Sequence, residues 1–400
     1  MLTNLSECNF TPKEELENRI KQLRTSMEKQ GMTFSIILQN VDLFYFAGTV
    51  QKGIFVIPVD HDPMLFIERN IDRAAIETSL EIIPIQRDKD VKDILMAKGI
   101  LNGKGGMEFD VVPVSVFERW KSLLGFESFA DVWPLIRDLR IVKSPFEIIQ
   151  AKKSGALCDH VFDKAKDVVR LGMREVDIAA ILEAEGRMVG HQGFLRMRGL
   201  NQEMMNLYIT HGLSGTIPSS GDVPIAGAGV THAIAQGPSL NKVEKGVPVV
   251  IDYGGGYNGY ITDETRPFVI GELKERFRKP YEVAKEIVED ATVYGKEGID
   301  GAELFMRAEE KAKKAGLEQY FMGFGPGKVS FVGHGLGLEI NELPVITPRH
   351  HIILQEGMVF AFEPKFIFPG EGAVGIEVDY IVRKKELVRV TRTPIDLVVL

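Results

Sequence analysis

The stretch of sequence that decides the fold is Ile251-Asp-Tyr-Gly-Gly-Gly-Tyr-Asn-Gly-Tyr-Ile-Thr-Asp-Glu-Thr-Arg266. Its Asn258-Gly259 pair is a strong signal for a two-residue type I′ hairpin, because both positions of that turn need a left-handed backbone. With this turn, Asp252 on the first strand faces Thr265 on the second, and Asp263 lies on the same face. The sequence therefore predicts a rigid hairpin that presents two carboxylates and a hydroxyl on one side.

Two carboxylates this close repel each other unless a cation lies between them. The alternative is that Asp252 and Asp263 are solvated residues beside a turn, which is a common fate for a single aspartate. It is a weaker explanation for two aspartates on one face of apolar strands. The pair therefore favours a metal site.

Three further residues extend this prediction. His334 lies between glycines in Val332-Gly-His-Gly-Leu-Gly337, and Glu363 and Glu377 lie inside apolar runs that are typical of strands. A carboxylate in such a strand is costly to bury unless it is paired or bound to a metal. Each glutamate could instead pair with a buried arginine, and a lone histidine among glycines could be an ordinary loop residue. Taken together, one nitrogen and many oxygens indicate a two-metal site for Mn, Co, Fe or Zn.

The composition is that of a globular protein with a sizeable core. The chain has 400 residues, a net charge of −8 and 44% hydrophobic residues. This balance argues against nucleic-acid binding and against a polybasic membrane anchor. Cys8 and Cys158 are too few for a disulfide framework. Because residues 1–16 lack the pattern of a signal peptide and no run of 18 apolar residues exists, we expect a cytoplasmic protein.

The order of the predicted elements indicates two domains, 1–138 and 139–400. In the first, Leu16, Ile20, Leu23 and Met27 recur at helical spacing, and short apolar runs alternate with helical segments, which is typical of an α/β domain. In the second, two helices, the later one at 175–188, precede a stretch of loops over residues 190–240. The elements predicted after these loops are strands at 249–253 and 260–270, helices at 273–294 and 301–315, and strands at 358–368, 373–382 and 387–391.

The order of these motifs is similar to that of a known family. The chain resembles the "pita-bread" metallopeptidases, which include methionine aminopeptidase, aminopeptidase P and prolidase, with creatinase as a metal-free relative. The motifs that carry the resemblance are, in order, Asp, a second Asp eleven residues later, Gly-His-Gly-Leu-Gly, Glu-Pro and Ile-Glu. The segments 41–48, 106–110 and 140–148 resemble landmarks of the aminopeptidase P, prolidase and creatinase branch. The resemblance implies an α+β protein with a creatinase-like N-terminal α/β domain. It also implies a C-terminal pita-bread domain with a curved antiparallel sheet.

The resemblance also implies roles for individual residues. Asp252 and Asp263 would bridge or chelate two divalent ions, Glu377 would bridge them, and His334 and Glu363 would each hold one. A water between the ions would be the nucleophile and Glu363 its general base. His232 would hydrogen-bond the substrate or the tetrahedral intermediate. Thr265 would support the ligands from behind.

The sequence departs from the family pattern at several positions. Asn341 stands where a second histidine is expected; an amide donates a hydrogen bond to a carbonyl oxygen but relays no proton. Gly375 and Val378 stand where the family has Arg and Asp around the last glutamate. The segment 194–204 is also unlike that of prolidases. Its polar residues Arg196, Arg198, Asn201 and Glu203 could shape a polar pocket, but for any single one of them an ordinary exposed loop is the favoured alternative.

Three functions are compatible with these residues. The first is a metal-dependent peptidase for short peptides, an Xaa-Pro dipeptidase or an aminopeptidase P-like enzyme. The second is an amide hydrolase of the same fold for a small non-peptide substrate, which the departures at Asn341 and 194–204 favour. The third is a binding protein that keeps the fold without catalysis. By resemblance we expect a homodimer.

Overall fold

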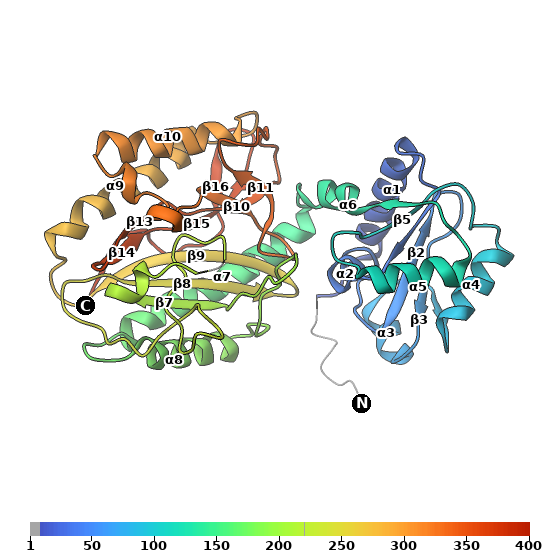
Figure 1. The fold of residues 1–400 in the computed structure, drawn as a ribbon, viewed down its shortest axis with the longest axis horizontal. Helices are drawn as coiled ribbons and strands as arrows, with labels where there is room; N and C mark the ends of the chain where they lie inside the picture. Colours follow the sequence, from blue (N-terminus) through green and yellow to red (C-terminus); the bar gives the residue numbers. More distant parts are fainter. Residues whose placement is uncertain (1–8, 220) are drawn as a thin grey trace. The chain divides into compact units, whose positions relative to one another are not determined.

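The computed structural model describes residues 9–219 and 221–400 (Figure 1). The chain divides into two compact units, Met1–Arg140 and Ile141–Leu400, and the sequence boundary of 138/139 lies two residues earlier. Cys8 and the first half of the segment considered for a signal peptide, residues 1–8, lie outside the described residues. Among the described helices, none is both long and apolar enough to cross a membrane.

The N-terminal unit contains a six-stranded mixed sheet in the order β4-β3-β2-β1-β5-β6. The predicted first helix is confirmed, and its repeating apolar residues from Leu16 to Met27 are buried. The strands are β1 (Phe34–Ile37), β2 (Gly53–Pro58), β3 (Met64–Ile67), β4 (Ile82–Pro84), β5 (Gly105–Met107) and β6 (Phe129–Asp131). The helices are α1 (Lys13–Lys29), α2 (Asn40–Ala47), α3 (Ile71–Glu77), α4 (Asp88–Ala97), α5 (Val114–Leu124) and α6 (Trp133–Arg140).

The C-terminal unit contains three antiparallel or mixed sheets flanked by helices. The sheets have the orders β17-β9-β8-β7, β11-β10-β12-β15-β16 and β13-β14. The helices are α7 (Pro145–Val168), α8 (Glu175–Met188), α9 (Glu275–Tyr294) and α10 (Gly301–Lys314). The strands are β7 (Leu207–His211), β8 (Val249–Tyr257), β9 (Tyr260–Val269), β10 (Gly333–Gly335), β11 (Glu342–Ile346), β12 (Val359–Phe362), β13 (Lys365–Phe368), β14 (Gly372–Gly375), β15 (Val378–Val382), β16 (Leu387–Arg389) and β17 (Val398–Val399).

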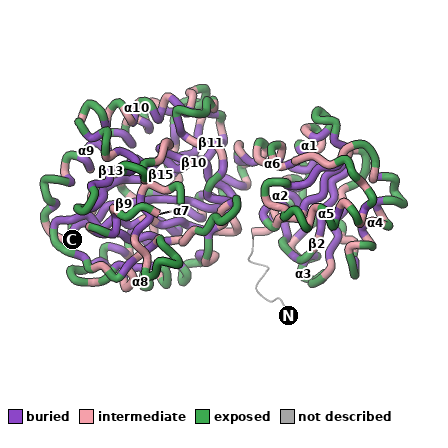
Figure 2. Tube along the Cα trace, in the orientation of Figure 1, coloured by how far each residue is buried: buried purple, intermediate pink, exposed green. Residues whose placement is uncertain are grey.

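The helices of this unit cover the sheets from two sides. Helices α7 and α8 pack on β7, β8 and β9, with residues such as Val161, Leu182 and Ile251 in one buried cluster. Helices α9 and α10 pack with β12, β13 and β15 in a second cluster. In Figure 2 the strands run through the buried interior, and exposed positions gather on the outer helices. The predicted fold class is confirmed.

The hairpin forms as the sequence predicts. Asn258 and Gly259 have φ values of 50° and 86°, and Asp252 pairs with Thr265 across the two strands. Because side chains alternate between the faces of a strand, Ile251 packs toward α7 and α8 while Asp252 points to the opposite face. The helices thus pack on one face of the hairpin, and the acidic face is directed toward the other sheets.

Glycines in β8 allow neighbouring segments to approach the hairpin closely. A Cβ placed on Gly254 would lie 2.2 Å from Leu195 Cδ1, and one on Gly255 would lie 2.6 Å from the Ser154 carbonyl oxygen of α7. A larger residue at Gly254 would therefore force the Leu195 side chain to move. His191 helps to fix the same segment, since its ring bonds the Gly254 carbonyl and the Gly193 N–H.

Two strands that the sequence predicts as continuous are each interrupted at a glutamate. The predicted strand 358–368 ends at Phe362 and resumes at Lys365, and the predicted strand 373–382 is interrupted between Gly375 and Val378. On either side of each interruption the chain belongs to a different sheet. Pro364 has no N–H with which to continue a ladder. Glu363 and Glu377 therefore lie at the junctions between sheets, where their carboxylates turn toward the hairpin.

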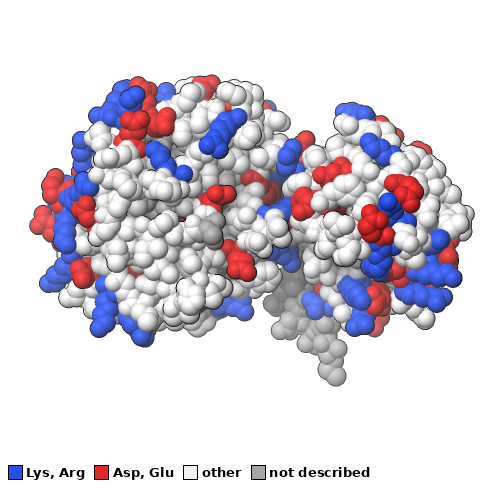
Figure 3. Space-filling model, in the orientation of Figure 1, with Lys and Arg blue, Asp and Glu red and all other residues white. Residues whose placement is uncertain are grey.

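Charges of both signs are mixed over the surface that Figure 3 shows. On the C-terminal unit, Lys, Arg, Asp and Glu gather mostly along the edge that carries α9 and α10, and the middle of the visible face carries few of them. This distribution agrees with the modest net charge of −8.

Candidate metal centre

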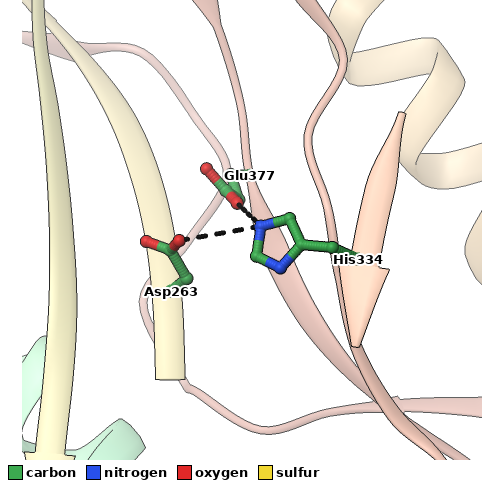
Figure 4. Close-up of side chains that lie close together, drawn as sticks. All are labelled: Asp263, His334 and Glu377. Atoms are coloured by element: carbon green, nitrogen blue, oxygen red, sulfur yellow. Dashed lines mark ion pairs between the residues drawn. The ribbon is translucent and has the colours of Figure 1, made fainter. Parts of the chain in front are cut away.

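The structure brings the five predicted ligands together from four separate segments of the chain. His334 Nε2 lies 3.8 Å from Asp263 Oδ2, 3.9 Å from Glu363 Oε1 and 3.9 Å from Glu377 Oε1. Figure 4 shows the imidazole directed at the carboxylates of Asp263 and Glu377. These distances are too long for hydrogen bonds. They suit ligands of one shared ion, since two atoms each about 2.1 Å from an ion are at most about 4.2 Å apart.

The carboxylate oxygens of the centre fit a cation. Asp263, His334 and Glu377 each offer one ligand atom, and these atoms lie within 4.8 Å of one another. Asp263 Oδ1 and Glu377 Oε1 are buried, and neither has a hydrogen-bond partner among the described residues. Buried carboxylate oxygens without partners are costly. An ion held beside His334 Nε2 would give Glu377 Oε1 a partner.

Lys365 is a member of the centre that the sequence analysis does not predict. Its Nζ lies 3.0 Å from Asp252 Oδ2, 2.8 Å from Glu363 Oε2 and 2.7 Å from Glu377 Oε2. The side chain is only 3% exposed. The signal that could have found it is its position two residues after Glu363 in an apolar run, because a buried lysine needs a negative partner. The alternative considered above was a buried arginine beside each glutamate. The structure has a buried cation beside both of them, but it is a lysine.

The crowding of like charges changes the protonation of the centre. Burial, and then the charges of Glu377 and Asp252, raise the pKa of Asp263 well above its usual range. Burial also raises the pKa of Glu377 to about 8, although Lys365 opposes this shift. Burial alone would lower the pKa of Lys365, but attraction to Asp252, Glu363 and Glu377 raises it well above its usual value. The lysine is therefore an ammonium group at neutral pH.

A second layer of hydrogen bonds orients the ligands. Thr265 Oγ1 donates to Glu377 Oε2 at 2.8 Å, in agreement with its predicted supporting position. Asp379 Oδ2 accepts from the Asp263 backbone N–H at 2.8 Å. Arg266 donates to the Glu377 carbonyl oxygen at 2.5 Å and to Glu264 at 2.8 Å. These contacts hold the segment around Glu377 to β9.

The ligands form one end of a cavity of about 290 Å³. From the segment 194–204, it is Met197, Gln202 and Met204 that line the cavity. Arg196, Arg198, Asn201 and Glu203, considered as a polar pocket wall, are not among the described residues that line this cavity. Other apolar wall residues come from 223–225, Phe331, Ile340 and Val345. A larger outer cavity of about 720 Å³ shares residues 222–224 and Phe331 with the inner one.

The two other predicted catalytic residues are placed differently from the ligands. His232 is exposed, beside the bridge between Thr231 and Ile234, and is not one of the described residues that line the inner cavity. The structure does not bring it to the centre, and its role stays a prediction. Asn341 does line the cavity, but its amide is paired with the backbone of Arg198.

The contacts of Asn341 favour a positioning role. Its Oδ1 accepts from the Arg198 N–H at 2.9 Å, and its Nδ2 donates to the Arg198 carbonyl at 2.8 Å. The Ile340 N–H also donates to the Arg196 carbonyl at 2.9 Å. Asn341 thus clamps the segment 194–204 beside the centre.

Replacing Asn341 by alanine is expected to raise KM about tenfold and to change kcat much less, because two wall-fixing hydrogen bonds are lost. Steady-state kinetics on a cleaved substrate measures this. Asn102→Ala, which removes an amide from the N-terminal unit, is the matched control. A fall in kcat of about a hundredfold or more at constant KM would instead identify Asn341 as a donor to the reacting carbonyl.

Comparison with known proteins agrees with this geometry. Residues 150–384 match the model of metallopeptidase family M24, and residues 19–142 match the creatinase/prolidase N-terminal domain. An Xaa-Pro dipeptidase of Pyrococcus furiosus is 28% identical over 96% of this chain and 100% of its own length. The prolidase structure from Pyrococcus horikoshii OT3 has a TM-score of 0.79 at 26% identity, covering 95% of this chain and 100% of that one.

A third similar protein is an X-Pro aminopeptidase. The X-Pro aminopeptidase structure from Thermotoga maritima MSB8 has a TM-score of 0.79 at 25% identity, and the match covers 95% of this chain and 99% of that one. The family match spans most of the C-terminal unit and includes all five predicted ligands. The arrangement of acidic ligands and one histidine, together with this match, leads to one conclusion: the chain belongs to metallopeptidase family M24.

Proposed function

We propose that this protein is a metal-dependent Xaa-Pro dipeptidase. The observation that carries the proposal is the convergence of Asp252, Asp263, His334, Glu363 and Glu377 at one end of a small cavity. Its volume of about 290 Å³ lies at the lower end of the range for ligand pockets, roughly 300–1,000 Å³. A cavity of this size suits a dipeptide better than a long chain.

The walls of the cavity suit a substrate with an apolar ring. Met197, Met204 and Ile340 offer an apolar surface against which a proline ring would pack, and the carboxylates line the same cavity. A free α-amino group of the substrate is a cation and would be attracted to this acidic end. The scissile amide would then lie between the apolar wall and the ligands.

The chemistry divides between the ion and the protein. When bound, a divalent ion polarises the amide carbonyl and lowers the pKa of an attacking water. Asp263, His334, Glu363 and Glu377 would hold that ion. The Glu363 carboxylate would accept the proton of the attacking water, as the sequence prediction has it. Tyr208, which also lines the cavity, remains protonated because burial raises its pKa.

The identity of the ion, the homodimer and the cytoplasmic location remain proposals from the sequence. An oxygen-rich set with one histidine suits Mn, Co, Fe or Zn. The sequence predicts two ions, and Lys365 Nζ lies among three of the carboxylates that would hold them.

The proposal is tested with a panel of Xaa-Pro dipeptides, Xaa-Pro-Yaa tripeptides and matched Xaa-Ala dipeptides. Protein loaded with Mn or Co is expected to cleave the Xaa-Pro dipeptides, and a chelator is expected to abolish the cleavage. Preference for the tripeptides would move the assignment to an aminopeptidase P-like enzyme. Metal-loaded protein that cleaves none of them would contradict a peptidase for short peptides.

A small non-peptide amide is the second candidate substrate. Asn341 supports it, because this residue pairs with the Arg198 backbone at the position where the resemblance implies a histidine. Small acyl amides and amidino compounds therefore belong in the same panel. Metal-dependent hydrolysis of one of these, without peptide cleavage, would favour this second function.

A further inference from the structure

The carboxylates of the centre turn their oxygens toward two different positions. One oxygen each of Asp252, Glu363 and Glu377 contacts Lys365 Nζ at 2.7–3.0 Å. The other oxygens of the two glutamates point instead toward His334 Nε2. Glu363 and Glu377 thus each bridge the same two positions, and a cationic group already lies at one of them.

The second position has a different set of neighbours. Around it are His334 Nε2, Asp263 Oδ2, Glu363 Oε1 and Glu377 Oε1, with 3.8–3.9 Å between the histidine nitrogen and each oxygen. Glu377 Oε1 has no hydrogen-bond partner within the described part of the chain. This position therefore offers the ligand atoms that an ion needs.

We propose that the Lys365 ammonium group takes the place of one of the two ions that the resemblance implies, so that this centre binds a single divalent ion. The ligands of that ion are Asp263, His334, Glu363 and Glu377. The inference rests on the proposed function for the presence of a metal centre, and it concerns the number of ions rather than the substrate.

Space is the first reason. An ion bound to Asp252, Glu363 and Glu377 through the oxygens that face Lys365 would lie about 2.0–2.2 Å from them. That point lies between the oxygens, where the ammonium group and its hydrogens already are. A divalent ion there would also repel the ammonium charge at very short range. The two cations therefore exclude each other.

The lysine is held in place by the fold. Lys365 begins β13 and pairs with Gly375 of β14. A Cβ on Gly375 would lie 2.5 Å from Lys365 Cγ and 2.8 Å from its Cα. The glycine thus leaves the room in which the lysine stem runs into the centre. Because the ammonium is buried and three carboxylates contact it, moving it away would leave a buried charge unpaired.

Charge by itself is compatible with one ion. Four carboxylates meet here, from Asp252, Asp263, Glu363 and Glu377. One ammonium group and one divalent ion offset three of the four negative charges, and a second divalent ion would leave one positive charge in excess. The two counts are equally far from neutrality, so the space that Lys365 occupies is what decides between them.

The number of bound ions tests the inference. The full chain, stripped with a chelator and saturated with Mn(II) or Co(II), is desalted, and metal per chain is measured by mass spectrometry. We expect one ion per chain in the natural protein and two in Lys365→Ala, which frees three carboxylate oxygens. Lys143→Ala is the matched control, because Lys143 is also buried and paired with a carboxylate, that of Glu342. It is expected to keep one ion.

Electron paramagnetic resonance of the Mn(II)-loaded natural protein is an independent measurement that needs no variant. We expect the spectrum of an isolated ion even with excess Mn(II), and the spectrum of an exchange-coupled pair in Lys365→Ala. Two ions or a coupled pair in the natural protein would overturn the inference. A single ion in Lys365→Ala would also overturn it, because the lysine would then not be what limits the count.

The outcomes separate this inference from the proposed function. A protein with one bound ion that cleaves no Xaa-Pro dipeptide would contradict the proposed substrate and leave the ion count standing. A protein with two bound ions that cleaves these dipeptides would support the proposed substrate and contradict the single-ion inference. A folded protein that binds no ion in either form would remove the metal centre, and with it both conclusions.

Discussion

Replacing Asp263 by asparagine is expected to lower kcat/KM on any cleaved substrate by about a thousandfold and to abolish tight metal binding. Asp263 offers a carboxylate oxygen to the ion position beside His334, and an amide oxygen is a much weaker ligand for a divalent cation. Loss of most of the electrostatic stabilisation that an ion supplies, about 4 kcal/mol, corresponds to this factor. Metal analysis and steady-state kinetics measure the two effects.

The stability of the metal-free protein separates this loss from unfolding. Burial and the charges of Glu377 and Asp252 raise the pKa of Asp263 in the folded state. A carboxyl with a raised folded pKa costs stability at every pH above its unfolded value of about 3.9. The amide of the variant carries no such cost, so metal-free Asp263→Asn is expected to melt no lower than the metal-free natural protein at pH 7. Added metal should raise the melting temperature only of the natural protein.

The matched control is Asp222→Asn. Asp222 is an exposed carboxylate that lines the same cavity without belonging to the ligand group. It should keep the bound metal and stay within a few-fold of the natural activity. Equal losses in both variants, or an Asp263→Asn protein that still binds metal tightly, would contradict the assignment of Asp263 as a ligand.

Replacing Arg266 by methionine is expected to destabilise the protein by about 3–5 kcal/mol, the largest stability change that we anticipate. Arg266 is fully buried, and its guanidinium donates to Glu264 and to the carbonyls of Thr265, Glu377, Thr393 and Pro394. Without it, the buried Glu264 carboxylate has lost its cation and four carbonyls have lost a donor. Calorimetry of the metal-free full chain should show a transition lowered by roughly 10 °C.

The pH dependence follows from Glu264. Burial raises the pKa of Glu264, and Arg266 opposes that shift. In Arg266→Met the pKa rises further, so the variant loses progressively more stability as pH increases above the unfolded pKa of the glutamate. The difference in melting temperature between the variant and the natural protein should therefore be larger at pH 8 than at pH 6.

Two further variants complete the test. Arg266→Met combined with Glu264→Gln should recover part of the lost stability, because no uncompensated charge is then buried. Arg278→Met, which removes an exposed ion pair with Glu275, should cost less than about 1 kcal/mol. If Arg266→Met lowered the stability no more than Arg278→Met does, the buried network would not be what joins β9 to the segment around Glu377.

Local patterns in the sequence were enough to predict much of the fold. The Asn258-Gly259 turn, the helical repeat from Leu16 to Met27 and the α8 boundaries follow from neighbours in the chain, and the structure has them as predicted. The continuous strands predicted through Glu363 and Glu377 are wrong. Apolar runs indicate extended chain but do not tell which sheet each half joins.

The candidate site divides in the same way. The carboxylates and His334 were identifiable because each is an expensive residue in an apolar or glycine-rich setting. The sequence analysis does not identify Lys365, because its role depends on ion pairs with Asp252 and Glu377, which lie on other segments of the chain. The amide of Asn341 pairs with Arg198, which is 143 residues away in the sequence, so no local pattern predicts this contact.

The sequence by itself indicated the acidic hairpin and the set of five candidate ligands, because turn chemistry, side-chain alternation and the cost of buried charge are local properties. The α+β class came from the resemblance to a known family. Only the tertiary structure decided which cationic side chain shares the centre and which of the described residues line the cavity, a set that does not include His232. Those outcomes depend on the packing of segments from β8, β9, β13 and β14, and on the room that Gly254 and Gly375 leave between them.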